Sequence, residues 1–239
     1  MSDNEGANFP LRGNWQKNNP EGIEYEYKKL LLVPMNKKPY LVGVSGGSAS
    51  GKTSFLKALR EQFSNQELCM VSQDNYYKLA YEHQKDENGH TNFDLPDCVD
   101  LEAFAVDIEK LAKGETIQRH EYLFQHENQQ GELLTFTPAP IIICEGLFIF
   151  YHEKIFSQFD LKIFINAEEE LALKRRIARD AAERNISETF VLYQWNNHVV
   201  PSYQQYLQPF MAQADMIINN NTHFGNSLNV VKAFLKEKI

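Results

Sequence analysis

Several features common in membrane, secreted and disulfide-bonded proteins are missing from this sequence. Its 239 residues contain no apolar run of transmembrane length, and the polar start Met1–Glu5 is unlike a signal peptide. The three cysteines, Cys69, Cys98 and Cys144, show no C-x-x-C spacing, and Cys69 and Cys144 lie in apolar runs typical of buried reduced thiols. We therefore expect a cytoplasmic protein.

Basic residues are also in deficit. Lys and Arg total 24 against 32 for Asp and Glu, so the formal net charge is −8. An acidic chain is a poor binder of nucleic acid or membrane surfaces, and any polyanionic ligand must meet a local basic site. No two of the seven histidines have metal-ligand spacing with a carboxylate, which argues against zinc. The length and the 43% hydrophobic content fit one globular domain with a sizeable core.

The sequence does contain one specific signal, the pattern G-x-x-x-x-G-K-[ST] at residues 46–53. The apolar run 40–44 before it predicts a buried strand, and the helical spacing of apolar residues over 54–63 predicts a helix after it. In that context, backbone N–H groups close around the phosphates of a nucleoside triphosphate. Lys52 is expected to reach between the phosphates and the Thr53 hydroxyl to bind Mg²⁺. The expected phosphate-binding residues are Gly46, Gly47, Ser48, Ala49, Ser50, Gly51, Lys52, Thr53 and Ser54.

The rest of the chain alternates strand-like and helix-like segments. Further strands are predicted at 68–72, 141–144, 161–165 and 216–218, and helices at 100–112, 147–158, 168–184, 187–212 and 226–237. Pro201 and Pro209 predict a kinked or broken helix in the stretch 187–212. The pattern predicts an α/β fold of the P-loop NTPase type, a parallel sheet with helices on both faces. An inserted β-hairpin at about 116–137 and a helical lid at about 168–200 are expected in addition.

Two carboxylates follow predicted core strands, and ligands bind at that edge of an open α/β sheet. Asp74 can accept the proton of an attacking hydroxyl or simply form a helix N-cap or turn, and its position favours neither role. Glu145 follows the most apolar strand, where a role in binding Mg²⁺ or its waters is favoured over that of a solvated acid.

Arginines are concentrated in the predicted helix 168–184. Neighbouring guanidinium groups of Arg175, Arg176 and Arg179, with Arg184 near the helix end, can clamp phosphates. The same helix also contains opposite-charge pairs at i,i+4 spacing, which is typical of a solvated surface helix. These pairs are Glu170–Lys174, Arg176–Asp180, Arg179–Glu183 and Asp180–Arg184. Spacing alone leaves both interpretations open.

Taken together, these segments resemble the uridine kinase family of P-loop phosphotransferases, the uridine–cytidine kinase and phosphoribulokinase group. The matching segments are Gly46–Thr53, Ser72–Tyr77, Asn92–Asp97, Tyr122–Phe124, Cys144–Gly146 and Arg175–Asp180. They occur in family order over about residues 40–219, so 39–239 is expected to form the kinase domain. Residues 1–38 are expected to be a mobile arm in which 23–33 can add a strand.

The resemblance implies an enzyme that uses ATP and Mg²⁺ to phosphorylate the 5′-hydroxyl of uridine or cytidine. Asp74 would be the general base, and Thr53, Glu145 and Asp74 would form the metal site. Arg179 and Arg184 would contact the ATP phosphates. The expected acceptor-binding residues are Asp94 and Arg176 at the ribose, Tyr122 and the nearby His126 at the pyrimidine, and Gln194 along the nucleoside pocket.

The sequence departs from the family pattern at residues 122–127, 183–186 and 219–221, so other acceptors remain open: another nucleoside, a sugar or a pantothenate-like alcohol. A GTP-binding switch is a weaker interpretation, because Asp86-Glu87-Asn88-Gly89 spells D-x-x-G without a preceding apolar strand. A catalytically dead regulator is opposed by the retention of Lys52, Thr53, Asp74 and Glu145. A small-molecule partner is expected, and a homo-oligomer is left open.

Overall fold

The computed structural model describes residues 38–79, 83–124 and 131–239, which belong to one compact unit that begins at Met35. The strand expected at 23–33 and the expected acceptor residue His126 lie outside the described residues. None of the described helices combines the length and the apolar character needed to cross a membrane.

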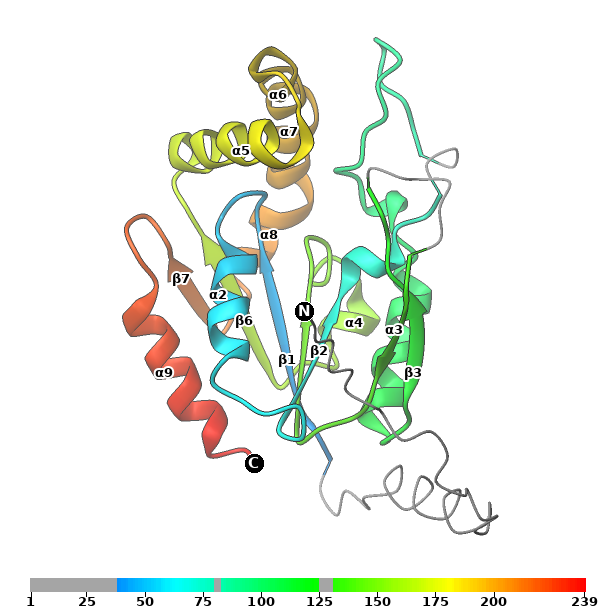
Figure 1. The fold of residues 1–239 in the computed structure, drawn as a ribbon, viewed down its shortest axis with the longest axis vertical. Coiled ribbons are helices and arrows are strands. Elements are labelled where there is room, and N and C mark those ends of the chain that lie inside the picture. Colours follow the sequence, from blue (N-terminus) through cyan, green and yellow to red (C-terminus); the bar gives the residue numbers. More distant parts are fainter. Residues whose placement is uncertain (1–37, 80–82, 125–130) are drawn as a thin grey trace, which may run out of the picture. The chain divides into compact units, whose positions relative to one another are not determined.

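A parallel sheet of five strands in the order β2-β5-β1-β6-β7 forms the centre of this unit (Figure 1). The strands are β1 (Tyr40–Gly46), β2 (Leu68–Ser72), β5 (Ile141–Glu145), β6 (Leu161–Asn166) and β7 (Met216–Asn219). β1 pairs with β5 on one side and β6 on the other, so the loop that follows β1 lies at the middle of the sheet edge. The predicted parallel α/β sheet is confirmed.

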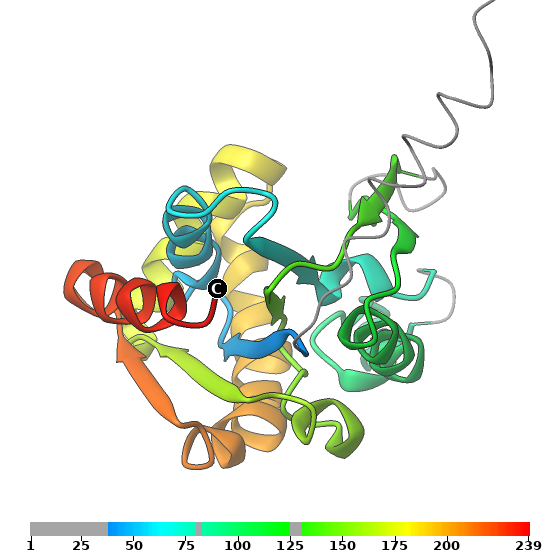
Figure 2. The ribbon, with the colours of Figure 1, turned by 90° about the horizontal axis from the view of Figure 1, so that it is seen from below.

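Helices cover both faces of this sheet, as Figure 2 shows. On one face, α2 (Lys52–Arg60) and α9 (Gly225–Lys236) bury Phe55, Leu59 and Leu235 against β1, β5 and β6. On the other face, α3 (Leu101–Ala112) buries Phe104 and Ile108 together with residues of the later helices. Because both faces are covered, the central strands are continuously apolar, which is why they could be predicted as short buried runs.

Of the segments that connect the core strands, the predicted hairpin is confirmed and one predicted helix is not. The hairpin consists of β3 (Ile117–His120) and β4 (Leu133–Phe136). The predicted helix at 147–158 is wrong, because only α4 (Glu153–Phe156) is helical. Phe148, Ile149 and Phe150 are consecutive and each at most 2% exposed. Three buried residues in a row cannot lie on one face of an amphipathic helix, so this segment turns through the core instead.

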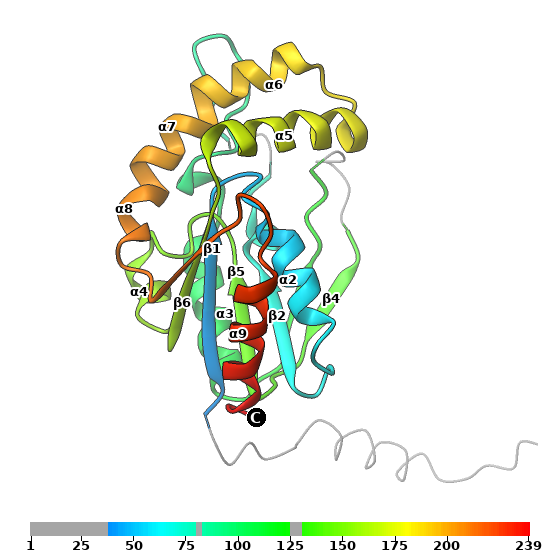
Figure 3. The same ribbon diagram turned by 90° about the vertical axis from the view of Figure 1, so that its left-hand side faces the viewer.

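Helices also lie above the carboxyl ends of the strands, in the part of the chain after β6 (Figure 3). α5 (Glu169–Arg184) is followed by α6 (Glu188–Gln194), α7 (Val200–Ser202) and α8 (Gln208–Met211). Two π-helical segments, η4 (Trp195–Val199) and η5 (Tyr203–Leu207), separate the last three.

The π-helical segments have a cause in the sequence. Pro201 and Pro209 lack the N–H group that an α-helix requires, and their rings clash with the carbonyl four residues earlier. The helix accommodates each proline by widening the turn before it. The N–H group of Val200 bonds to the carbonyl of Trp195, and that of Gln208 bonds to Tyr203, each five residues back. The predicted interruption is confirmed, and it takes the form of π-bulges.

Candidate active site

The loop 46–53 closes over the carboxyl end of β1 and leads directly into α2. Gly51 is the N-cap of α2 and has φ 93°, a left-handed conformation that favours glycine. Asn220, which follows β7 and is 5% exposed, donates from Nδ2 to the Ser50 carbonyl at 2.9 Å. A side chain at position 51 would collide with that amide. The loop is thus braced from a distant strand, and sequence reasoning missed Asn220.

Lys52 and Glu145 form a partly buried ion pair at the sheet edge. Lys52 Nζ lies 2.5 Å from Glu145 Oε2, and the side chains are 13% and 15% exposed. The Ser72 hydroxyl donates to Glu145 Oε1 at 2.5 Å, so residues from β2, β5 and the loop after β1 converge. Although burial alone would raise the pKa of Glu145, the charge of Lys52 lowers it below the usual value. Glu145 is therefore held as a carboxylate. The two other predicted phosphate-site residues, Thr53 and Ser54, follow Lys52 in the first turn of α2.

Asp74 lies close to this pair, in the short 3₁₀ helix η1 (Gln73–Tyr76). The alternative role of Asp74 as N-cap is wrong, because Ser72 is the cap and its Oγ accepts the Asp74 N–H at 3.2 Å. Burial, followed by the nearby Glu145 charge, raises the pKa of Asp74, while Lys52, Arg184 and Arg179 act in the opposite direction. The charge of Asp74 therefore interacts with groups of both the sheet edge and α5.

The arginines of α5 differ in exposure, because Arg176 is buried while the side chains of Arg179 and Arg184 are 32% and 35% exposed. Asp180 is fully buried and lies at the centre of three of them. Its Oδ1 accepts from Arg179 Nε at 2.8 Å and lies 3.4 Å from Arg184, and its Oδ2 lies 3.3 Å from Arg176 Nε. Arg175 points elsewhere and donates to the Asn220 carbonyl at 2.9 Å. Three guanidinium groups are therefore oriented together by one carboxylate that sequence reasoning treated only as a surface partner.

Arg176 connects this cluster to the loop after β1 and to α6. It donates to Ser48 Oγ at 2.9 Å and to Gln194 Oε1 at 3.5 Å. Asp94, from the loop before α3, lies within reach of the same charges. Burial raises the pKa of Asp94, while Arg176 and then His198 act against that rise. Arg176 and Gln194 are thus joined directly, and Asp94 lies near enough to Arg176 for their charges to interact.

An aromatic cluster lies between Asp74 and Asp94. The rings of Tyr77 and Tyr122 are 5.4 Å apart, and Phe124 lies 5.0 and 4.8 Å from them. Burial and then the charges of Asp74 and Asp94 raise the pKa of Tyr77 well above its usual value. Tyr122 thus lies among aromatic rings of which Tyr77 and Phe124 are the neighbours that the sequence did not indicate.

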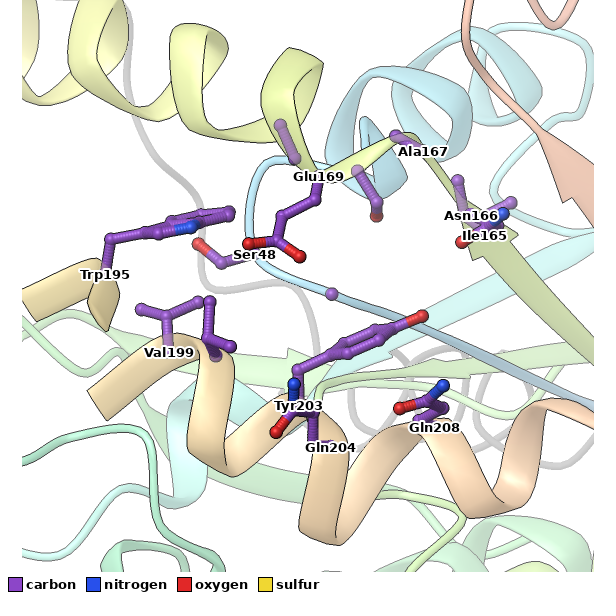
Figure 4. Close-up of a pocket in the computed structure, with 14 residues that line it drawn as sticks. Ser48, Ile165, Asn166, Ala167, Glu169, Trp195, Val199, Tyr203, Gln204 and Gln208 are labelled. Atoms are coloured by element: carbon purple, nitrogen blue, oxygen red, sulfur yellow. The ribbon is translucent and has the colours of Figure 1, made fainter. Parts of the chain in front are cut away.

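A cavity of about 250 Å³ lies on another side of the same loop, bordered by Gly47, Ser48 and Ser50. Figure 4 shows Trp195, Val199 and Tyr203 from the helix facing it and Glu169 from the start of α5. Neither Asp74 nor Asp94 lines this cavity.

A parallel sheet with a phosphate-binding loop after its central strand, a partly buried lysine in that loop and a cluster of arginines on a nearby helix defines a P-loop phosphotransferase. The model of the phosphoribulokinase/uridine kinase family matches residues 41–223. The chain belongs to this family and is an ATP-dependent phosphotransferase.

Relatives and solved structures support the family and the fold. A uridine kinase from Brevibacillus brevis is 36% identical over 180 residues, which cover 75% of this chain and 84% of that protein. A uridine kinase from Borrelia duttonii is 34% identical over 196 residues, or 82% and 94% of the two chains. A candidate fructose transport system kinase from Silicibacter sp. TM1040 shares the fold, with a TM-score of 0.59 and 15% identity over 82% of this chain and 97% of its own.

Proposed function

We propose that this protein transfers the γ-phosphoryl group of ATP to the 5′-hydroxyl of a pyrimidine ribonucleoside, uridine or cytidine. The observation that carries the proposal is the hydrogen bond of Arg176 to Gln194, beside an Asp94 on which the charge of Arg176 acts, with both Asp74 and Asp94 acting on Tyr77. A carboxylate and a guanidinium near one another suit two adjacent hydroxyl groups, because one group accepts hydrogen bonds and the other donates them. The names of the relatives agree with this acceptor.

The donor side of the site is the loop 46–53 with the N-terminus of α2. In our proposal the backbone N–H groups and Lys52 bind the β- and γ-phosphates, and α5 belongs to a lid of about residues 168–200 that carries Arg179 and Arg184 to them. The charges of these arginines already act on Asp74, which supports their location beside the phosphoryl group. Their positive charge would stabilise the charge that develops in the transition state.

Magnesium fits the oxygen ligands that the site offers. The residues that would hold it are Thr53, Glu145 and Asp74, through the hydroxyl and carboxylate oxygens that Mg²⁺ prefers. The described residues contain no cluster of three or more His, Cys, Asp or Glu side chains arranged as a complete metal cage. An ion bound there would neutralise phosphate charge.

Asp74 is the proposed general base. Burial and the neighbouring Glu145 raise its pKa, which makes it a stronger proton acceptor than an exposed aspartate. It would take the proton of the acceptor hydroxyl as that oxygen attacks the γ-phosphate. Tyr122 and His126 would contact the pyrimidine. A reaction of this kind would serve pyrimidine salvage in the cytoplasm, with a small-molecule acceptor.

The test is a panel of kcat/KM values for uridine, cytidine, deoxyuridine, adenosine, pantothenate and ribulose 5-phosphate. Uridine should exceed deoxyuridine by about a hundredfold or more, because a missing hydroxyl leaves the buried polar groups that bind it unpaired. Turnover of a non-nucleoside with uridine and cytidine both inert would refute the acceptor while leaving the phosphotransferase in place.

A matched pair of variants tests the residues. Asp94→Ala should raise the KM for the nucleoside by roughly tenfold or more and leave the KM for ATP within about twofold. Asp97→Ala removes the same charge from an exposed position of the same loop and should change neither constant. Equal effects of both variants would show that the loop charge, and not a contact of Asp94, is what matters.

A further inference from the structure

The D-x-x-G tetrapeptide 86–89 forms the tip of a loop that reaches the helices above the sheet. Asp86 organises the loop, because its Oδ1 accepts the N–H groups of Asn88 and His90 at 2.9 Å each. The Asp86 N–H donates to the His90 carbonyl at 2.8 Å, and Gly89 adopts φ 80°. One carboxylate oxygen is thus used within the loop, which leaves the other for a partner outside it.

That partner is the helical segment 188–199. Asp86 Oδ2 accepts from the Tyr193 hydroxyl at 2.7 Å and from His198 Nε2 at 2.7 Å. Because a carboxylate only accepts, His198 must carry its proton on Nε2. Asn88 Nδ2 donates to the Tyr193 hydroxyl at 2.7 Å, and the His90 ring packs edge-on against Tyr193 at 5.1 Å. His198 is 2% exposed and the Asp86 side chain is 17% exposed, so the histidine side of this contact is the buried one.

The π-bulge η4 explains how Tyr193 and His198 reach the same carboxylate. In an α-helix, residues five apart differ by about 140° around the axis and face different sides. The i→i+5 bond at Val200 widens the turn and reduces this angle. The local geometry follows from Pro201, whose missing N–H prevents regular α-helix there. The convergence of Tyr193 and His198 on Asp86 is therefore a consequence of the bulge.

The same loop leads directly to Asp94. The Asn92 N–H donates to the Gln84 carbonyl at 3.0 Å and closes the loop, and Asn92 Oδ1 accepts the Asp94 N–H at 2.9 Å. On the helix side, Gln194 is adjacent to Tyr193 and bonds to Arg176. His198 lies close enough to act on the charge of Asp94. The contact thus ties together the two segments that carry acceptor-side residues.

We propose that Asp86 and His198 are positioning residues that hold the lid helix against the loop carrying Asp94 and so fix Asp94 and Gln194 for the acceptor. The proposal rests on the acceptor site described under the proposed function. Neither residue needs to touch the acceptor. The alternative is that the Asp86–His198 pair only stabilises the fold. In that case its loss would lower thermal stability without a selective rise in the KM for the acceptor.

The kinetic test compares Asp86→Asn and His198→Phe with the control Glu87→Gln, an exposed position in the same loop. Asp86→Asn and His198→Phe should each raise the KM for the acceptor by about tenfold and leave the KM for ATP within about twofold. Glu87→Gln should change neither. The double variant should be little worse than either single variant, because both remove one interaction.

His198→Gln provides the rescue, since its amide can still donate to Asp86, and it should recover part of the acceptor KM. Equal rises in both KM values, or a loss confined to thermal stability with no change in KM, would overturn the positioning role. Should Asp86→Asn fail to fold, Tyr193→Phe removes a single hydrogen bond to the same carboxylate. It should raise the KM for the acceptor by a smaller factor and again leave the KM for ATP unchanged.

A second measurement does not depend on the acceptor. Hydrogen exchange of the wild type and of Asp86→Asn should show faster exchange in both segments 84–92 and 188–199, with the strands unchanged. If the wild type phosphorylates none of the pyrimidine ribonucleosides, the proposed function fails, and the kinetic test uses the acceptor that is turned over. Unchanged exchange in either segment would refute the link between loop and helix itself.

Discussion

The buried carboxylate of Asp180 provides the sharpest stability prediction. It is 0% exposed and lies 3.3 Å from Arg176, whose side chain is 7% exposed. Arg179 and Arg184 are 32% and 35% exposed, so they can turn toward water when the carboxylate is removed. Arg176 has no such freedom, because its other bonds go to Ser48 and Gln194. Asp180→Ala therefore leaves one guanidinium group buried without its counter-charge.

Removing one partner of a buried ion pair costs about 3–5 kcal/mol. Because two of the three arginines can relax, we expect the lower end of this range, a decrease of about 3 kcal/mol in the free energy of unfolding. For a domain of this size that corresponds to a fall in Tm of about 6–12 °C. Asp180→Asn keeps the shape and one acceptor, and should cost less.

The measurement is urea and thermal unfolding followed by circular dichroism on the ligand-free protein. Glu109→Gln is the control, because Glu109–Lys113 has the same i,i+4 spacing with side chains 54% and 67% exposed. It should change the free energy of unfolding by no more than about 0.5 kcal/mol. If Asp180→Ala also cost less than about 1 kcal/mol, burial would not be what distinguishes the two pairs.

Two predictions concern the chemistry. Lys52→Ala should lower kcat by roughly two to four orders of magnitude. The control Lys57→Ala changes an exposed residue of the same helix and should have no effect. If a folded Lys52→Ala variant kept activity within about tenfold of wild type, the role of Lys52 at the phosphates would be contradicted. Asp74→Asn should lower kcat and leave the affinity for ATP·Mg²⁺ nearly unchanged, and an equal loss of that affinity would make Asp74 chiefly a metal ligand. Because the folded-state pKa of Asp74 is raised, the base is protonated at low pH, and wild-type kcat/KM should rise with pH through a pKa above the usual aspartate range. A raised folded-state pKa also means that Asp74 stabilises the fold when it is protonated, and this stabilisation is lost as pH rises through that pKa. The pH dependence of kcat/KM and the pH dependence of stability should therefore both be absent in Asp74→Asn.

Much of the fold was predictable because its signals are local. The strand β1, the phosphate-binding loop and the start of α2 are adjacent in the sequence, and a buried parallel strand must be continuously apolar. The helix predicted at 147–158 failed for the opposite reason. Its apolar residues are buried by contacts with distant elements, and composition does not distinguish such a turn from a helix.

Charge patterns show most clearly what only the tertiary structure decided. Arg176–Asp180 and Glu109–Lys113 have the same spacing in the sequence, yet the first is buried and the second exposed. Whether a pair is buried depends on which distant segment packs over it, and here α6 and the loop after β1 do so. The prolines at 201 and 209 predicted an interruption, but the meeting of Tyr193 and His198 with Asp86 required the fold.

The sequence by itself determined the phosphate-binding loop, the order of the strands along the chain and the carboxylates at the strand ends, because these depend on residue type and adjacency. The tertiary structure decided the partners. It placed Lys52 on Glu145, Asn220 behind the loop, and three arginines around Asp180. Each of these contacts joins residues from different elements or depends on burial, and the free energy of a buried charge is set by its surroundings in space rather than by its neighbours in the chain.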